Sequence, residues 1–571
     1  MPDNSKTDSP KDPVAISQAN PVALAQKPLT PPLEELVQTY YQASLADKVT
    51  PEIGTIHVDE IASKVAFFYE KVRKIVDWKE EHLVRRGAIE RILKRRMISE
   101  LSGISLVKNL DPHKIAEPLV IELIRGGHFT NGKIPRSKVM EVQKVLEKYI
   151  FILDNNPTAK KGKIVVKKKI NLYTWILEIA ACEIEETLEP PIRENALILC
   201  MLQLMNERIK VLPQGTIPEA EKQTQIYIAI HRSLFNLDSP IISYHLIKNR
   251  WPNWGNLNQP ELQTISNDIF QIIIDVDKNL THPLGGKFYN LCEKYDTIYL
   301  LLGDALKKLG RKPQKMLPVF QNPKQLLAQV KKAYLKRLKT LKKRLIRAAI
   351  YSTLSIFLAG GFSLYIFEIP LAKLVYGEWK LLAIVVDILL PTALMALLVA
   401  FVRPPKKGNL KRVLAETRKV VYPQKKIDVY EIRTTRKIGP ILKIFVGLLY
   451  LAGTVASLGL VFWVFSLAKV PLTSLYVDTL NVAMIVFAAL VIKQRAQELT
   501  VEAKPGFWDF ILDILSVPMG KIGQWLSNKW KEYNVVSVFF IALVDMPFST
   551  FIGFIDNWSS FIKEKKAEIT Q

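Results

Sequence analysis

Two aspartates lie inside long apolar segments of this 571-residue chain, and their carboxylates are the side chains best placed to do chemistry. Asp387 is six residues into the segment 381–402, and Asp478 is a similar distance into the segment 472–492. A charged carboxylate inside a membrane costs roughly 3 kcal/mol unless it is paired, so such an acid is a functional-site hypothesis. The chemistry that fits is the binding of a cation or a proton. Further polar candidates in apolar surroundings are Asn481 and Asp545.

A structural role for both aspartates is the alternative. Each carboxylate would then be hydrated near the membrane surface, or would bond to a neighbouring helix, with Asn481, Lys373 and Lys469 as the obvious partners. Pro391, one turn after Asp387, removes a backbone donor and can kink its helix. Transporters usually have more spans, with paired interrupted helices at the membrane midplane. Both alternatives stay open at this point.

A phosphate-binding loop is the next candidate, because Gly127–Lys133 fits the first seven positions of the P-loop pattern. The following residue, Ile134, has no hydroxyl that could bind Mg²⁺, and the preceding segment has a helical pattern instead of a strand pattern. Pro135 is suited to open another helix. We therefore expect an ordinary loop between two helices and no bound nucleotide.

Other metal-binding or nucleophilic patterns are missing from the sequence. Four glutamates cluster between residues 183 and 189, but no histidine follows any of them by three residues, as di-iron bundles require. We predict a solvated acidic helix end there. The cysteines at 182, 200 and 292 are far apart and are predicted to be reduced thiols. We expect no cofactor, no metal site and no enzymatic activity.

The formal charge of +25 indicates an anionic partner, either nucleic acid or a membrane surface. The membrane is favoured because the densest basic clusters flank the apolar segments. The basic run from Arg85 to Arg96 is predicted to be a solvated helix face, and the basic loop 160–169 lacks aromatic residues that could stack on bases. A nucleic-acid partner is therefore not expected.

The elements that carry these residues are predicted to be helices. Apolar residues recur at spacings of three and four in the segments 112–125, 137–153, 172–188, 194–211, 219–235, 259–277 and 288–308. No series of alternating strands is found, so residues 33–330 are predicted to form an all-α domain, with two packed bundles as an alternative. Residues 1–32 contain seven prolines and few large apolar residues, which predicts a disordered tail. This tail has no apolar region typical of a signal peptide, so we expect a cytoplasmic domain.

A basic cluster at 331–347 directly precedes the uncharged segment 348–367. Its candidate contacts with anionic lipid head groups are Lys331, Lys332, Lys336, Arg337, Lys339, Lys342, Lys343, Arg344 and Arg347. Leucines recur at spacings of three and four from Leu335 to Leu345. We predict one continuous helix that runs from this cluster into the segment 348–367, with its leucines against the protein.

Four segments match the roughly 20 residues that a helix needs to cross a membrane. They are 348–367, 381–402, 444–467 and 472–492. The loop 403–443 holds thirteen Lys or Arg and three acids, whereas the other two connections are not enriched in basic residues. Basic loops stay in the cytoplasm, so we predict two hairpins that point outward from a cytoplasmic domain. Asp387 and Asp478 would then lie at a similar depth.

The region 493–571 has an amphipathic pattern. A stripe of large apolar residues from Trp508 to Trp530, interrupted at Pro518, predicts a pair of helices in the interface plane. The segment 535–555 is long enough to span but contains Asp545, and crossing would place three lysines outside. We favour a bent interfacial segment there, with a fifth span as the alternative.

These observations predict a non-enzymatic, multi-pass protein of a prokaryotic inner membrane that acts as a scaffold or assembly platform. Its partners would be anionic lipids, proteins that the sequence does not identify, and further copies of itself. The alternative is a channel or transport component that uses Asp387 and Asp478.

Overall fold

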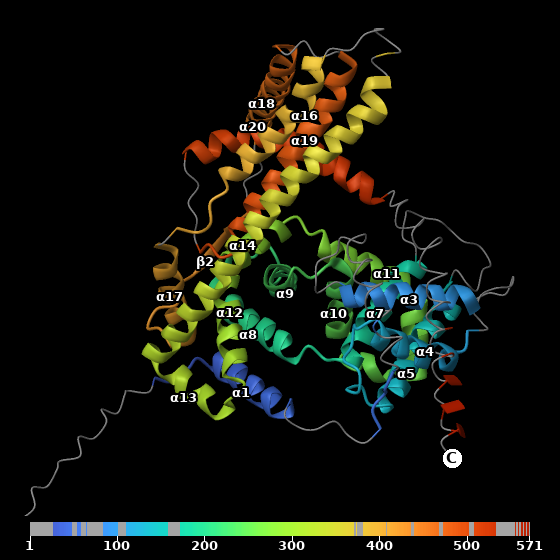
Figure 1. The fold of residues 1–571 in the computed structure, drawn as a ribbon. Coiled ribbons are helices and arrows are strands. Elements are labelled where there is room, and N and C mark those ends of the chain that lie inside the picture. The colour runs from blue at the N-terminus through green and yellow to red at the C-terminus, as the bar shows by residue number, and fades with distance from the viewer. Residues whose placement is uncertain are drawn as a thin grey trace, which may run out of the picture.

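The computed structural model describes residues 27–47, 54–58, 84–100, 110–157, 172–370, 381–406, 408–434, 439–467, 472–501 and 507–532, together with a few isolated positions. Helices make up most of these residues, and the prediction of an all-α fold is confirmed. Figure 1 shows a bundle of long helices that stands on a wider helical domain. The helix α14 (Pro323–Ser363) runs from the domain into the bundle.

One part of the domain is organised around α12 (Gly285–Leu309). Packed around it are α1 (Pro31–Ala46), α8 (Ile192–Arg208), α9 (Glu219–Phe235), α13 (Met316–Gln321) and the first turns of α14. Phe288, Tyr299 and Phe320 are fully buried in this first core. Large aromatic side chains dominate the energetics of a core, so these three contribute strongly to its stability.

The other part of the domain has a second hydrophobic core. Its helices are α3 (Val84–Glu100), α4 (Pro112–Arg125), α5 (Ser137–Asn155), α7 (Leu172–Leu188), α10 (Ser239–Arg250) and α11 (Gln259–Leu280). Local caps set several boundaries: the Asp111 side chain accepts from the backbone of His113 at the start of α4, and Asn258 forms a capping box with Glu261 in α11. Gln225 of α9 donates to the Asn279 carbonyl at 2.9 Å and so links the two parts.

The basic segment 403–443, predicted to be a loop, contains regular structure that belongs to the first core. Helix α17 (Gly408–Val421) buries Val413 and Val420 there. Strand β2 (Tyr430–Arg433) then pairs in parallel with β1 (Ile209–Leu212), so that Ile209 lies opposite Tyr430. Because β1 follows α8 directly, the predicted helix 194–211 ends earlier than expected, at Arg208.

The bundle contains the upper part of α14, α16 (Leu381–Ala400), α18 (Pro440–Leu467) and α19 (Leu472–Ala496). Two helices in the described part of the chain are long and apolar enough to cross a membrane, at Pro323–Ile366 and Thr479–Ala496. Shorter apolar helices lie at Ile388–Ala400 and Tyr450–Val464, within the other two predicted spans.

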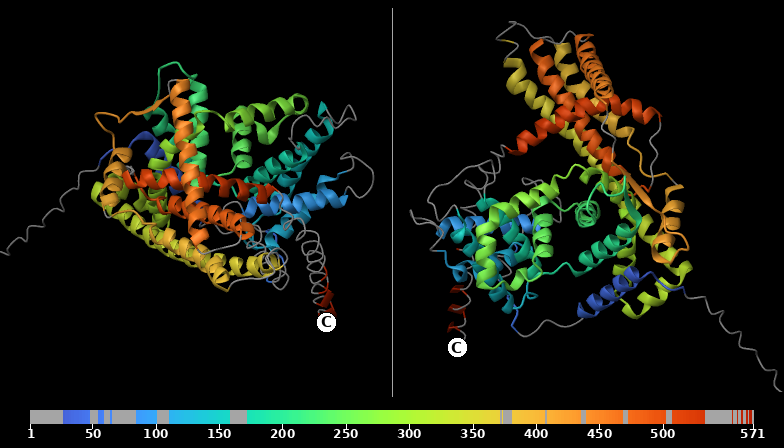
Figure 2. Two further views of the ribbon diagram at one scale, coloured as in Figure 1. Left: turned by 90° about the horizontal axis from the view of Figure 1, so that it is seen from above. Right: turned by 180° about the vertical axis from the view of Figure 1, so that it is seen from behind.

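Helix α20 (Phe507–Glu532) crosses the bundle and packs on α18 and α19 (Figure 2). It continues through Pro518, so the predicted break into two helices is wrong. Gly523 explains the close approach to α19, because a Cβ there would lie 2.3 Å from the Ala483 carbonyl oxygen and 2.7 Å from the Phe487 Cβ. The segment 535–555, with Asp545, lies outside the described residues.

Candidate functional site: the junction between domain and bundle

Helix α14 forms the first connection between the domain and the bundle. Pro323 occupies its first turn, and the Asn322 side chain accepts from the backbone N–H groups of Lys324 and Gln325, which caps the helix. The helix then continues for 41 residues without a break. A straight helix of this length spans about 60 Å at 1.5 Å per residue, enough to cover both the domain and a bilayer core. The predicted continuous helix is confirmed.

The basic face of α14 points mainly to solvent. Arg337 is the exception, because its guanidinium pairs with both carboxylate oxygens of Asp304 on α12, with one distance of 2.9 Å. Arg337 therefore contributes to the junction as well as to the positive charge. The other eight residues are exposed and have no acidic partner within the described part of the chain: Lys331, Lys332, Lys336, Lys339, Lys342, Lys343, Arg344 and Arg347.

The apolar face of α14 packs on the first core, as its leucine spacing predicts, with one correction. Leu341 is buried, and Leu338 and Leu345 are partly buried against the same core. Leu335 is 48% exposed and does not belong to this face. Tyr334 takes its place and is 2% exposed.

The second connection depends on Asn409, near the start of α17. Its side-chain amide donates to the Tyr334 hydroxyl at 3.0 Å and to the Leu499 carbonyl at 2.6 Å, and its side-chain oxygen accepts from the Val501 backbone at 3.0 Å. One buried side chain thus joins α14, α17 and the segment after α19. Local sequence patterns could not reveal this residue, because its partners are 75 to 92 positions away.

The segment after α19 makes the third connection. Leu499 and Val501 are buried in the first core. The Thr297 hydroxyl of α12 donates to the Glu498 carbonyl at 2.9 Å and to the neighbouring Asp296 carboxyl at 3.1 Å. Burial raises the pKa of Asp296 well above its usual range. Three segments at the domain end of the bundle, α14, α17 and the segment after α19, therefore contribute to one core.

Further hydrogen bonds fix α17 and β2 on the domain. The Tyr422 hydroxyl donates to the Phe320 carbonyl at 2.7 Å, and Arg208 donates to the Lys419 carbonyl at 3.2 Å. The rings of Tyr295 and Tyr430 stack with centroids 4.5 Å apart. These contacts join α17 and β2 to the helices of the first core.

The outer surface of the bundle is strongly apolar. Among the described side chains of α18, the large apolar ones that are more than half exposed are Ile441, Ile444, Phe445, Leu448, Leu451, Val455, Leu460, Phe462, Trp463 and Leu467. In a soluble protein, another element usually covers a continuous apolar surface of this kind. In a membrane protein, the surface can face the lipid tails, which solvate it at no cost.

Three of the predicted intramembrane polar residues, Asp387, Asp478 and Asn481, lie on two neighbouring helices. Asp387 is in α16 and Asp478 is in α19, and these helices pack against each other and both run toward the domain. Their side chains lie outside the described part of the structure. Asn481, one turn after Asp478, is half-buried.

The cluster of acids at 183–189 is partly buried, which contradicts the predicted solvated helix end. Glu183 accepts from the Lys148 ammonium at 2.5 Å, from the Tyr149 hydroxyl at 2.7 Å and from the Trp254 indole at 2.8 Å. Burial lowers the pKa of Lys148, although Glu183 beside it acts in the opposite direction. Each polar atom in this group has a partner, which is typical of a structural network.

Burial also raises the pKa of Glu185 to about 7. Its carboxylate lies 3.9 Å from Arg85 of the basic run 85–96, and that run is not the solvated face that was predicted. Arg86 is buried and pairs with Asp238, and Arg96 pairs with Glu122 at 2.8 Å. The run therefore holds α3 against its neighbours.

The loop Gly127–Lys133 follows α4, a helix, as predicted. Its Asn131 side chain exchanges two hydrogen bonds of 3.1 Å with the backbone of Val58, and Gly132 lies against His57. The loop is thus packed on another segment of the chain. Cys182, Cys200 and Cys292 are free, as predicted, and all three are buried.

Within the described residues no group of three or more His, Cys, Asp or Glu could hold a metal ion. Comparison with known proteins finds no matching family model, no matching curated protein and no matching solved structure.

Proposed function

We propose that this protein is a non-enzymatic, membrane-anchored scaffold whose helical domain is held in a fixed orientation on the cytoplasmic side. Its four apolar helices, α14, α16, α18 and α19, would cross the membrane as two hairpins, with α20 packed across them. The observation that carries the proposal is the triple connection described above, in which α14, α17 and the segment after α19 share one core with the domain.

The charge distribution supports the orientation. The described helix α17 and strand β2 of the basic segment 403–443 lie at the domain end of α14, the same helix that carries the eight exposed basic residues. Lys and Arg near a span attract the anionic cytoplasmic leaflet, each by about 1 kcal/mol. The same charge bias supports a domain on the cytoplasmic side, and our proposal places it at a prokaryotic inner membrane.

Affinity capture of the full chain in mild detergent tests the scaffold. We expect defined proteins to co-purify at a fixed ratio, and to be lost from the variant Asn409→Ala, which loosens the junction. The matched variant Asn267→Ala removes an exposed amide elsewhere and should keep them. Purification of the chain alone under all conditions would contradict the scaffold.

A second candidate function is ion or proton movement through Asp387 and Asp478. It is favoured by the parallel packing of α16 on α19, which allows the two carboxylates to be neighbours in the membrane. The double variant Asp387→Asn and Asp478→Asn should then abolish ion flux in reconstituted vesicles. An unchanged flux would refute this candidate.

A further inference from the structure

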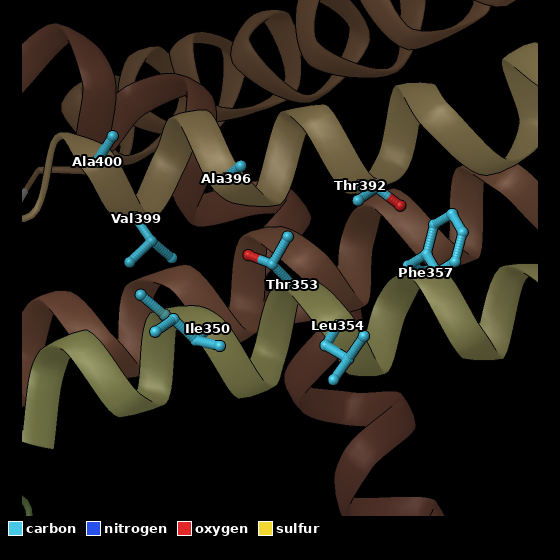
Figure 3. Close-up of a pocket in the computed structure, with 9 residues that line it drawn as sticks. Ile350, Thr353, Leu354, Phe357, Thr392, Ala396, Val399 and Ala400 are labelled. Atoms are coloured by element: carbon cyan, nitrogen blue, oxygen red, sulfur yellow. The ribbon is translucent and has the colours of Figure 1, made fainter.

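A groove of about 570 Å³ runs between α14 and α16 on the outer surface of the bundle. Val399 and Ile350 point toward each other at its domain end, and Phe357 lies beside Thr392 at its other end (Figure 3). The groove exists because the helices carry small side chains at facing positions, among them Ala396 and Ala349. From residue 349 to residue 357 the wall is about 12 Å long at 1.5 Å per residue.

The wall of the groove offers almost no polar contact. Ile350, Leu354 and Phe357 are each at least 43% exposed along it. The Thr392 hydroxyl donates to the Ile388 carbonyl of its own helix at 2.7 Å, so it is already satisfied. Thr353 carries the other hydroxyl of the wall, and the remaining lining side chains are apolar, so an occupant must be mainly apolar over this length.

Among the described residues that border the groove, positively charged side chains lie only at its domain end. On α14, Arg347 precedes Ile350 by three residues and Lys343 precedes it by seven, which places both on the same helix face as the groove. On the other side α16 ends at Ala400, which lines the groove, and Arg403 follows three residues beyond that helix end. All three basic side chains are exposed. The groove thus has an apolar body and a basic mouth.

We infer that this groove binds one acyl chain of an anionic glycerophospholipid, whose phosphate is held by Arg347 and Arg403. Charge complementarity selects this occupant, because an acyl chain fits the apolar wall and a phosphate fits two guanidinium groups at one end. The inference rests on the proposed membrane insertion of α14 and α16. A bound lipid here would connect the first hairpin to the inner leaflet.

Native mass spectrometry of the purified full chain in mild detergent tests this site. We expect one phosphatidylglycerol to bind per chain more tightly than phosphatidylcholine with the same acyl chains. The double variant Arg347→Gln and Arg403→Gln should weaken phosphatidylglycerol binding by about tenfold or more. The matched variant Lys114→Gln and Lys144→Gln removes two exposed charges of the second core, on α4 and α5, and should bind normally.

Filling the groove gives a second test that does not depend on charge. Ala396→Leu places an isobutyl group in the wall and should abolish the tightly bound lipid, whereas Ala393→Leu, at an exposed position of α16 outside the groove, should not. Equal affinity for the two lipids, equal binding by all variants, or a lipid-free dimer would overturn the inference. The dimer would show that a second copy covers the groove.

Alkaline extraction of membranes separates this failure from failure of the proposed function. If the protein stays in the membrane pellet but does not bind phosphatidylglycerol selectively, only the lipid site is refuted. If the protein is released into the supernatant, the proposed membrane anchor is refuted, and the lipid site is refuted with it.

Discussion

Replacing Asn409 by alanine should weaken the junction more than any other single polar change near it. The variant leaves the Leu499 carbonyl and the Val501 N–H without their partner in a buried place, and the Tyr334 hydroxyl loses one bond. Leaving a buried polar group unsatisfied costs about 1–3 kcal/mol. With two backbone groups and one hydroxyl affected, we expect a loss of roughly 3–6 kcal/mol of unfolding free energy.

Thermal unfolding of the full chain in mild detergent, followed by intrinsic fluorescence, measures this loss. The apparent melting temperature should fall by roughly 6–12 °C, taking a few degrees per kcal/mol for a domain of this size. Asn267→Ala removes an exposed amide whose oxygen accepts from Gln263 at 3.2 Å, and should change the melting temperature little. If both variants melt at the parent temperature, Asn409 does not hold the junction together.

Three further changes have directions fixed by the structure. Glu183→Ala leaves the buried Lys148 charge unpaired and should cost about 3–5 kcal/mol, whereas the double change Lys148→Met with Glu183→Leu should restore much of the melting temperature. Burial raises the pKa of the Glu185 carboxyl from 4.5 to about 7, so its contribution to stability is complete below pH 4.5 and is lost as pH rises through 7. Glu185→Gln has no carboxyl to ionise, so its stability relative to the parent should rise by up to ~3 kcal/mol between pH 5 and 8. The melting temperature of this variant should therefore fall less over that pH range than the melting temperature of the parent. Gly523→Ala should displace α20 and lower the melting temperature, while Gly459→Ala, where a new Cβ meets open space, should be tolerated; equal melting temperatures for these two variants would contradict the close packing.

The sequence predicted most of the helices because their cores are periodic and their ends carry local signals. The bounds of α4, α7 and α9 agree with the predicted segments, and the continuous helix α14 follows from its leucine spacing. Helix α10 was not predicted, although Asp238 caps its start and Pro240 follows, because its apolar residues do not form one clear stripe.

The junction itself could not be predicted, because it depends on contacts between distant segments. The basic charge of the segment 403–443 predicts a loop. In the fold, however, β2 pairs with β1, and Val413, Val420 and Ile432 are buried in the first core. Glu183 lies in an acidic run that suggests solvent exposure, and only the fold brings Lys148 to it. In both cases tertiary packing overrides the local pattern.

The arrangement of the helices relative to a membrane is the central claim, and cysteine accessibility in sealed membrane vesicles tests it most directly. Single cysteines in place of Lys339 and Lys425, both exposed in the structure, should react with an impermeant reagent from one side. Cysteines in place of Lys373 and Lys469 should react only from the other side. Labelling of all four positions from the same side would contradict two membrane-crossing hairpins attached to a domain on one face.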